Sequence, residues 1–346
     1  MPGSGTTPAT CHPPPIVRPR RTRPSDSSPS ASARRHSLPG VFDEIDVSDW
    51  PQAGQETLGT KPKRWLEQPD AGVYWLMKDR TENRRKDGTS FPKGDDWAER
   101  VASAVAGVLG LPAAETELVV VHTGDESTYG VISRSVLTSR TDERLAHGNE
   151  LLADAGFDVG AGKNRRGYTP EAVRTTLAPL DAPADVDEGT TAWDVFVGYL
   201  VLDALIGNTD RHHENWAAIV SKTGPRLAPT FDHASSLGFQ LDDDRRQEAL
   251  ATKDELRTPE AYADRATSKF EGRLHPVDVA VEALDTLGAQ ERARRLDRCR
   301  DLRPLVEAVE QVPDNRMSPA AREFAIRLVQ RNRSRLLSHP FGTLSS

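Results

Sequence analysis

The chain has 346 residues, of which 45 are basic and 52 acidic, and this length allows one two-lobed enzyme or two modest domains. Its two cysteines, Cys11 and Cys299, exclude a disulfide framework and fit a reducing compartment. Residues 1–40 hold six arginines and one acid, which leaves 39 basic and 51 acidic residues elsewhere and disfavours general nucleic-acid binding. No apolar run reaches the roughly 18 residues of a membrane-spanning helix, so we expect a soluble, cytoplasmic protein without a membrane partner.

The first 40 residues differ in composition from the rest. They are rich in proline, serine and arginine and cannot repay the entropy of ordering, so we predict a disordered tail. A basic arm for an acidic partner is the functional alternative. Behind the tail we expect a small nucleotide-binding lobe at 41–137 and a large helical catalytic lobe at 138–346.

A basic segment with a central glycine follows at 56–66. Gly59 allows close backbone approach, and Thr60, Lys61 and Lys63 lie around it. Backbone amides and positive charge in such a loop suit nucleotide phosphates. The segment is neither a Walker A sequence nor a G-x-G-x-x-G, so from these residues alone a solvated basic turn remains the alternative.

The next candidate is a lysine at the end of an apolar strand. The run at 72–78 is aromatic and aliphatic and ends in Lys78, where kinases place a phosphate-contacting lysine that pairs with a helix glutamate. A helix is predicted at 97–109, and Glu99 in its first turns is the expected partner. A glutamate that only complements the helix dipole is the alternative. The lobe should also contain a charged loop at 79–94 and strands at 116–122 and 129–136.

A cluster of polar residues follows a long apolar helix predicted at 193–206. Gly207 and Asn208 accept the left-handed conformation that ends helices. Asp210 and Asn215 then lie five residues apart, which is the spacing in kinases between the catalytic aspartate and a magnesium-binding asparagine. Taken singly, such residues are more often helix caps or turn formers.

A predicted hairpin brings a second acid to this loop. A strand at 216–220, a turn at 222–225 and a return strand into Phe231 would place Asp232 beside Asn215. Carboxylate and amide oxygens are the ligands that Mg²⁺ prefers. The coincidence of loop, hairpin and second acid favours a site over separate turn formers.

The remainder of the chain is predicted to be mostly helical. Polar residues at 137–190 could shape the substrate side, and a mobile loop is expected at 242–256, where kinases have an activation segment. Helices are predicted at 259–270, 276–287, 289–299, 302–312 and 318–337. The expected fold class is therefore α+β, with a small mixed β lobe, a larger helical lobe and the site between them.

The loop Asp210-Arg211-His212-His213-Glu214-Asn215 resembles the D-x-H-x-x-N catalytic loop of HipA-type kinases, and residues 229–236 resemble their metal-binding segment. The residue order D-R-H-x-x-N also occurs in phosphoinositide kinases. The resemblance therefore implies a two-lobed protein-kinase-like fold of the HipA and phosphoinositide-kinase type. It implies that Asp210 is the catalytic base, that His212 stabilises the loop or shares proton handling, and that Asn215 and Asp232 bind Mg²⁺.

The resemblance also implies ATP as cofactor and a protein serine or threonine as acceptor. Lys78 would contact the phosphates, the loop around Gly59 would cover them, and self-phosphorylation there would fall on Thr57 or Thr60. Backbone groups near Ile132, Ser133 and Arg134 would hold adenine. The tail cannot fold into the N-terminal subdomain of full-length HipA toxins, which argues against pairing with a helix-turn-helix antitoxin.

Three other functions stay open on the residues. The D-R-H-x-x-N order also suits a kinase of lipids or small molecules, and the same pocket could serve a nucleotide-binding regulator without catalysis. A zinc site could instead combine His212 and His213 with Asp210 and Asp232 in a hydrolase, although adjacent histidines on one loop rarely converge on one ion.

Overall fold

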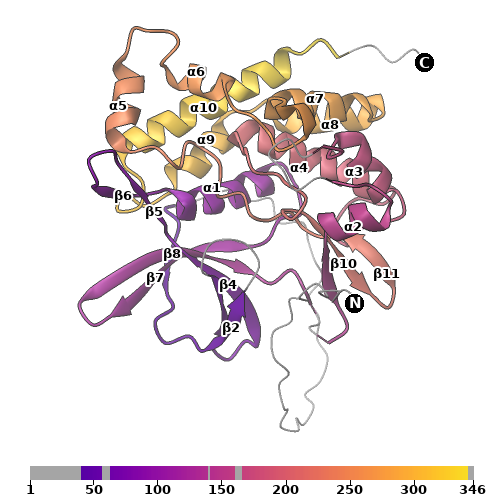
Figure 1. Cartoon of the computed structure of the whole chain (residues 1–346), viewed down its shortest axis with the longest axis horizontal. Helices are drawn as coiled ribbons and strands as arrows, with labels where there is room; N and C mark the ends of the chain where they lie inside the picture. The colour runs from indigo at the N-terminus through magenta and orange to yellow at the C-terminus, as the bar shows by residue number, and fades with distance from the viewer. Residues whose placement is uncertain (1–39, 57–62, 139–140, 160–165, 342–346) are drawn as a thin grey trace, which may run out of the picture.

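The computed structural model describes residues 40–56, 63–138, 141–159 and 166–341. Within these ranges the chain forms a lobe built on a β-sheet, indigo to purple in Figure 1, and a larger lobe of helices, magenta to yellow. The α+β class expected from the sequence is confirmed. The predicted disordered tail lies, except for Gly40, outside the described residues.

Six strands form the sheet of the small lobe in the order β1-β7-β8-β4-β3-β2. Their bounds are β1 Glu44–Asp46, β2 Gln52–Glu56, β3 Lys63–Gln68, β4 Val73–Asp79, β7 Thr116–Thr123 and β8 Glu126–Arg134. Neighbouring strands are antiparallel, except that β1 runs parallel to β7. Trp75 and Met77, two residues apart on β4, are buried on one face together with Val119 and Ile132, as the two-residue period of a strand requires.

One helix joins this sheet to the helical lobe. α1 (Asp95–Val108) packs on β7 and β8 and also on α9 and α4, and Figure 1 shows it between the two layers. Trp97, Val101 and Val105 recur at helical spacing and are buried. Gly110 follows the helix with a φ of 62°, the left-handed conformation typical of a helix end. Glu99, near the start of α1, is thereby buried at the boundary between the lobes.

The large lobe is arranged around α4. Its described helices are α2 Gly148–Asp154, α3 Pro170–Leu177, α4 Ala192–Ile206, α5 Asp243–Ala251, α6 Pro259–Asp264, α7 Pro276–Asp285, α8 Ala289–Arg298, α9 Arg303–Glu310 and α10 Pro319–Ser338. α4 contacts α7, α10 and α1 and is buried over almost its whole length, which explains its apolar sequence on every face. In the described ranges, no helix is both long and apolar enough to cross a bilayer.

A three-stranded sheet also belongs to this lobe. It consists of β9 Arg144–His147, β10 Ala217–Ser221 and β11 Gly224–Leu227, with β10 in the middle. The predicted hairpin is therefore present, but its return strand ends at Leu227 and an irregular segment leads on to Asp232.

Two predicted loops contain regular structure instead. Residues 79–94 include a hairpin of β5 Glu82–Arg84 and β6 Ser90–Pro92, and the expected mobile loop at 242–256 begins with α5. Asp242 caps α5 by accepting a hydrogen bond from the Arg245 amide at 3.0 Å, and buried Arg246 donates to the Gly238 carbonyl at 3.2 Å. The prediction of a mobile loop was wrong for the α5 segment. An N-terminal cap and a buried arginine stabilise this helix, and its sequence lacks the apolar periodicity from which a helix is predicted.

A buried arginine between α9 and α10 ties the helical lobe to the sheet. The Arg316 guanidinium donates to Asp96 Oδ2 of α1 at 2.8 Å and to the Val119 carbonyl of β7 at 2.6 Å. It also pairs with Glu44 of β1 and lies 4.3 Å from the centre of the Tyr129 ring. Burial raises the pKa of Asp96 to about 6, although Arg80 and Arg316 act in the opposite direction.

We predict that Asp96→Asn flattens part of the dependence of stability on pH. Because the folded pKa of Asp96 lies above its unfolded value, the native protein binds a proton between about pH 4 and 6 that the unfolded chain has lost. As the pH rises from about 4 to 6, the free energy of unfolding of the wild type should therefore fall, and this group should account for about 2 to 3 kcal/mol of the decrease. Urea unfolding at several pH values measures it.

The exposed Asp125 in the turn between β7 and β8 provides the control, because Asp125→Asn should leave the pH profile unchanged. A profile of Asp96→Asn that runs parallel to the wild type between pH 4 and 6 contradicts the prediction.

Candidate active site

The loop that follows α4 is held by a buried ion pair. Gly207 ends α4 with a φ of 63°, and the chain then turns so that Arg211 reaches back to Asp203 on the helix. The guanidinium makes two hydrogen bonds to this carboxylate, at 2.7 and 2.9 Å, and Asn208 Nδ2 donates to it at 2.8 Å. All three side chains are buried. A bidentate arginine pair is geometrically specific, so it fixes the path of the loop.

The same guanidinium binds the backbone at or beside each of the two predicted metal ligands. Arg211 Nη1 donates to the carbonyl of Asn215 at 2.6 Å and lies 3.5 Å from the carbonyl of Phe231, the residue before Asp232. Asn215 Nδ2 in turn donates to the Asp210 carbonyl at 2.8 Å. The amide group of Asn215 is thus oriented by Asp210, which leaves its oxygen as the atom that a cation would use.

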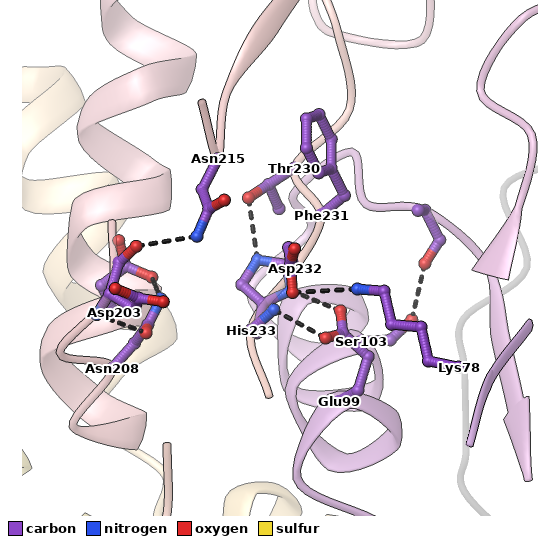
Figure 2. A network of polar contacts seen from close by, with 12 residues as sticks. Lys78, Glu99, Ser103, Asp203, Asn208, Asn215, Thr230, Phe231, Asp232 and His233 are labelled. Carbon is purple, nitrogen blue, oxygen red and sulfur yellow. Dashed lines mark hydrogen bonds and ion pairs between the residues drawn. The ribbon is translucent and has the colours of Figure 1, made fainter. Parts of the chain in front are cut away.

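Asp232 lies between two lysines of the small lobe. Its carboxylate is 2.9 Å from Lys78 Nζ on β4 and 3.8 Å from Lys63 Nζ on β3, as the close view in Figure 2 shows for Lys78. Burial raises the pKa of Asp232, but the charges of Lys78 and Lys63 outweigh it and hold this pKa well below its usual range. The structure therefore brings the predicted lysine to the predicted second acid, and the acid is ionised.

Glu99 has a different partner from the one expected. Its carboxylate accepts a hydrogen bond from the His233 amide at 2.8 Å and lies 3.2 Å from His233 Nδ1, while Thr230 Oγ1 contacts His233 Nε2 at 2.8 Å (Figure 2). Burial lowers the pKa of Lys78, but Asp232 and then Glu99 outweigh it and raise that pKa. Glu99 thus acts on Lys78 through its charge, and its hydrogen bonds position the residue after Asp232.

Asp210 faces solvent at the edge of this arrangement. Its side chain is 35 % exposed, and its carboxylate is 3.1 Å from Lys269 Nζ. His212 donates its amide to the Asp210 carbonyl at 2.7 Å, and its Nδ1 accepts from the Glu214 amide at 3.2 Å. The two hydrogen bonds of His212 therefore stabilise the turn that carries Asp210, whose carboxylate is partly exposed and paired with Lys269.

The histidines of the loop form a separate cluster. His212, His213 and Glu214 have ligand atoms within 4.8 Å of one another, and they make up the metal-ligand group found in the described part of the chain. Neither Asp210 nor Asp232 belongs to it. The zinc site considered from the sequence, which combined both histidines with both aspartates, is therefore not formed in this structure.

The residues predicted for the adenine lie inside the sheet. Ile132, Ser133 and Arg134 belong to β8, which pairs with β4 on one side and β7 on the other. A central antiparallel strand uses its backbone groups on both neighbours, so the sheet takes up the backbone groups of Ile132 and Ser133. Arg134 pairs with β4 and donates its amide to the Glu115 carbonyl at 2.8 Å.

The predicted phosphate loop is described only at its end. Gly59, Thr60 and Lys61 lie outside the described residues, as does Thr57, whereas Lys63 is on β3 beside Asp232. The arrangement as a whole offers two oxygen ligands of the kind that Mg²⁺ takes, a partly exposed carboxylate that could accept a proton, and two ammonium groups for phosphate oxygens. Asp203, Arg211 and His233 hold it and were not singled out from the sequence.

Comparison with known proteins identifies relatives of this fold. The family model described as HipA-like C-terminal domain matches residues 55–301. A 66-residue stretch is 41 % identical to the serine/threonine-protein kinase CtkA of Helicobacter pylori; it makes up 18 % of this chain and 19 % of that protein's length.

Solved structures are similar over more of the chain. The crystal structure of the proinflammatory kinase CtkA from Helicobacter pylori covers 84 % of this chain and 94 % of its own, with a TM-score of 0.63 and 20 % identity. HipA of Shewanella oneidensis, solved with HipB and operator DNA, covers 83 % of this chain and 66 % of its own, with a TM-score of 0.49 and 13 % identity. The similarity to CtkA confirms the kinase-like two-lobed fold.

We predict that Asp203→Leu destabilises the protein by about 3 to 5 kcal/mol, because it leaves the buried charge of Arg211 without its partner. The free energy of unfolding in urea measures this. Glu115→Gln is a matched control, since it breaks a carboxylate–arginine pair with Arg134 of 2.9 Å that is about half exposed, and it should cost at most about 1 kcal/mol. Equal effects of the two substitutions would refute the assignment of Arg211 as the residue that holds the loop.

Proposed function

The chain belongs to the family of HipA-like C-terminal domains, and from this premise we propose that it is an ATP- and Mg²⁺-dependent phosphotransferase whose acceptor is a hydroxyl group. The observation that supports the proposal is a chain of contacts: Asp232 pairs with Lys78, Arg211 binds the backbone of Asn215 and of the residue before Asp232, and the Asn215 amide donates to the Asp210 carbonyl. These groups come from both lobes and from segments far apart in the sequence. In a phosphotransferase such positioning and charge supply most of the catalysis.

The residues divide the work of the reaction. Asn215 and Asp232 would hold Mg²⁺, which when bound neutralises charge on the phosphates. Lys78 and Lys63 would bind the phosphate oxygens and place the terminal phosphorus in line with the acceptor. Asp210 would accept the proton of the acceptor hydroxyl as its oxygen forms the new bond to phosphorus, and the bond to the leaving ADP breaks on the opposite side.

A protein serine or threonine is the acceptor we favour. The support is that CtkA, which resembles this chain in fold, is a serine/threonine-protein kinase. A lipid or small-molecule acceptor is the second candidate, and its support is the Asp210-Arg211-His212 order that phosphoinositide kinases share. Transfer of labelled phosphate from ATP to protein acceptors, compared with inositol lipids and sugars, separates the two.

We predict that Asp210→Asn lowers phosphate transfer by about 10²- to 10⁴-fold, because the amide cannot accept the proton of the hydroxyl. Its affinity for ATP with Mg²⁺ should change little, since Asp210 is not one of the proposed metal ligands. Label transfer and calorimetry measure the two effects. The exposed Asp142 gives the control variant Asp142→Asn, which should match the wild type. Unchanged turnover in Asp210→Asn contradicts catalysis and leaves a nucleotide-binding regulator.

We also predict that Asp232→Asn removes the dependence of nucleotide affinity on Mg²⁺. In the wild type, the affinity for ATP should fall on the order of tenfold, about 1.4 kcal/mol, when EDTA replaces the metal. The variant should bind equally well with and without Mg²⁺, because one of the two oxygen ligands has lost its charge. A variant that still requires Mg²⁺ as the wild type does would show that the metal lies elsewhere.

A further inference from the structure

A lysine from a distant segment of the large lobe reaches the proposed catalytic base. Lys269 follows α6 and lies 59 positions after Asp210 in the sequence, yet its Nζ is 3.1 Å from Asp210 Oδ1. The pair is partly exposed, with side chains 40 % and 35 % accessible. An exposed ion pair of this kind is on its own worth at most about 1 kcal/mol, so its meaning depends on what holds the lysine there.

The residue after Lys269 is rigidly anchored. Phe270 is 2 % exposed, and its ring stacks on that of Tyr168 with centroids 4.5 Å apart and planes 5° from parallel. The Glu271 amide donates to the Tyr168 carbonyl at 2.8 Å, and the Glu271 carboxylate accepts from the Gly167 amide at 2.9 Å. The backbone on the far side is fixed as well, because the Ser268 amide donates to the Leu274 carbonyl at 2.8 Å.

This anchor is connected to the catalytic loop. The hydroxyl of Tyr168 accepts a hydrogen bond from Trp216 Nε1 at 3.1 Å, and Trp216 is the residue after Asn215. Asp210 and Lys269 are therefore linked twice. They form an ion pair, and the contacts of Phe270 with Tyr168 and of Tyr168 with Trp216 connect the segment of Lys269 to the loop that carries Asp210. A lysine held in this way is preorganised, whereas the Lys222–Asp142 pair has the same 3.1 Å distance with side chains 86 % and 54 % exposed.

We propose that Lys269 is a positioning residue of the phosphoryl-transfer site, which orients the Asp210 carboxylate toward the acceptor hydroxyl. The proposal rests on the proposed function. Because the base must lie within hydrogen-bond reach of the proton that it takes, a carboxylate free to rotate would spend less time in the productive orientation. The ammonium fixes one oxygen and leaves the other for the acceptor.

Steady-state kinetics of the full chain with ATP, Mg²⁺ and casein test the proposal. Lys269→Met should lower kcat by about 10- to 100-fold, the size of effect that a misplaced catalytic group produces, with KM for ATP and the thermal unfolding midpoint close to those of the wild type. Lys269→Arg keeps the positive charge and should restore most of kcat. Lys222→Met, which breaks the exposed pair with Asp142, should behave as the wild type.

A double substitution tests whether Lys269 affects kcat through Asp210. In an Asp210→Asn background, Lys269→Met should cause no further loss, because the lysine acts through that carboxylate. A further loss of tenfold or more, or an unchanged kcat in Lys269→Met alone, overturns the positioning role while the kinase assignment stands. A wild-type protein that transfers no phosphate to itself, to casein or to the lipid and sugar acceptors overturns both.

Discussion

The guanidinium of Arg211 is the interaction on which the candidate site depends. It binds Asp203 on α4, the carbonyl of Asn215 and the segment that leads to Asp232, so one planar group sets the relative positions of a helix, a loop and a second segment. A buried ion pair of this kind adds little net stability compared with apolar residues, because desolvation offsets the attraction. Its value lies in geometry, since a shift of about 1 Å in a catalytic group can cost on the order of a hundredfold in rate.

The lobes are joined at places that differ in burial. Arg316 with Asp96, and His233 with Glu99, are buried contacts between the large lobe and the first turns of α1. The Lys78 pair with Asp232 is different, because the carboxylate is 29 % exposed and both groups belong to the proposed nucleotide site. Phosphates that bind Lys78 would thus replace one contact between the lobes and leave the buried ones intact.

Predictions from the sequence succeeded where local residue types mark the end of a helix or strand. Gly207 ends α4 where the apolar run stops, and Lys78 lies near the end of an apolar strand, so the element bounds followed from residue types. It failed where partners are chosen in three dimensions. Glu99 binds His233 because the segment after β11 crosses α1, and Ile132 is interior because β8 pairs on both sides. Neither the partner of Glu99 nor the interior position of Ile132 is indicated by the residue type. The helix α5 was missed because its polar sequence has no apolar periodicity.

The backbone of Asp232 directs two neighbouring side chains to different partners. Its φ of 60° is left-handed, a conformation that glycine adopts without cost and that asparagine and aspartate tolerate better than other residues. This turn sends consecutive side chains in different directions, Asp232 to Lys78 and His233 to Glu99. Glycine or asparagine would fit the backbone at least as well, but it would leave Lys78 and Lys63 without a balancing charge.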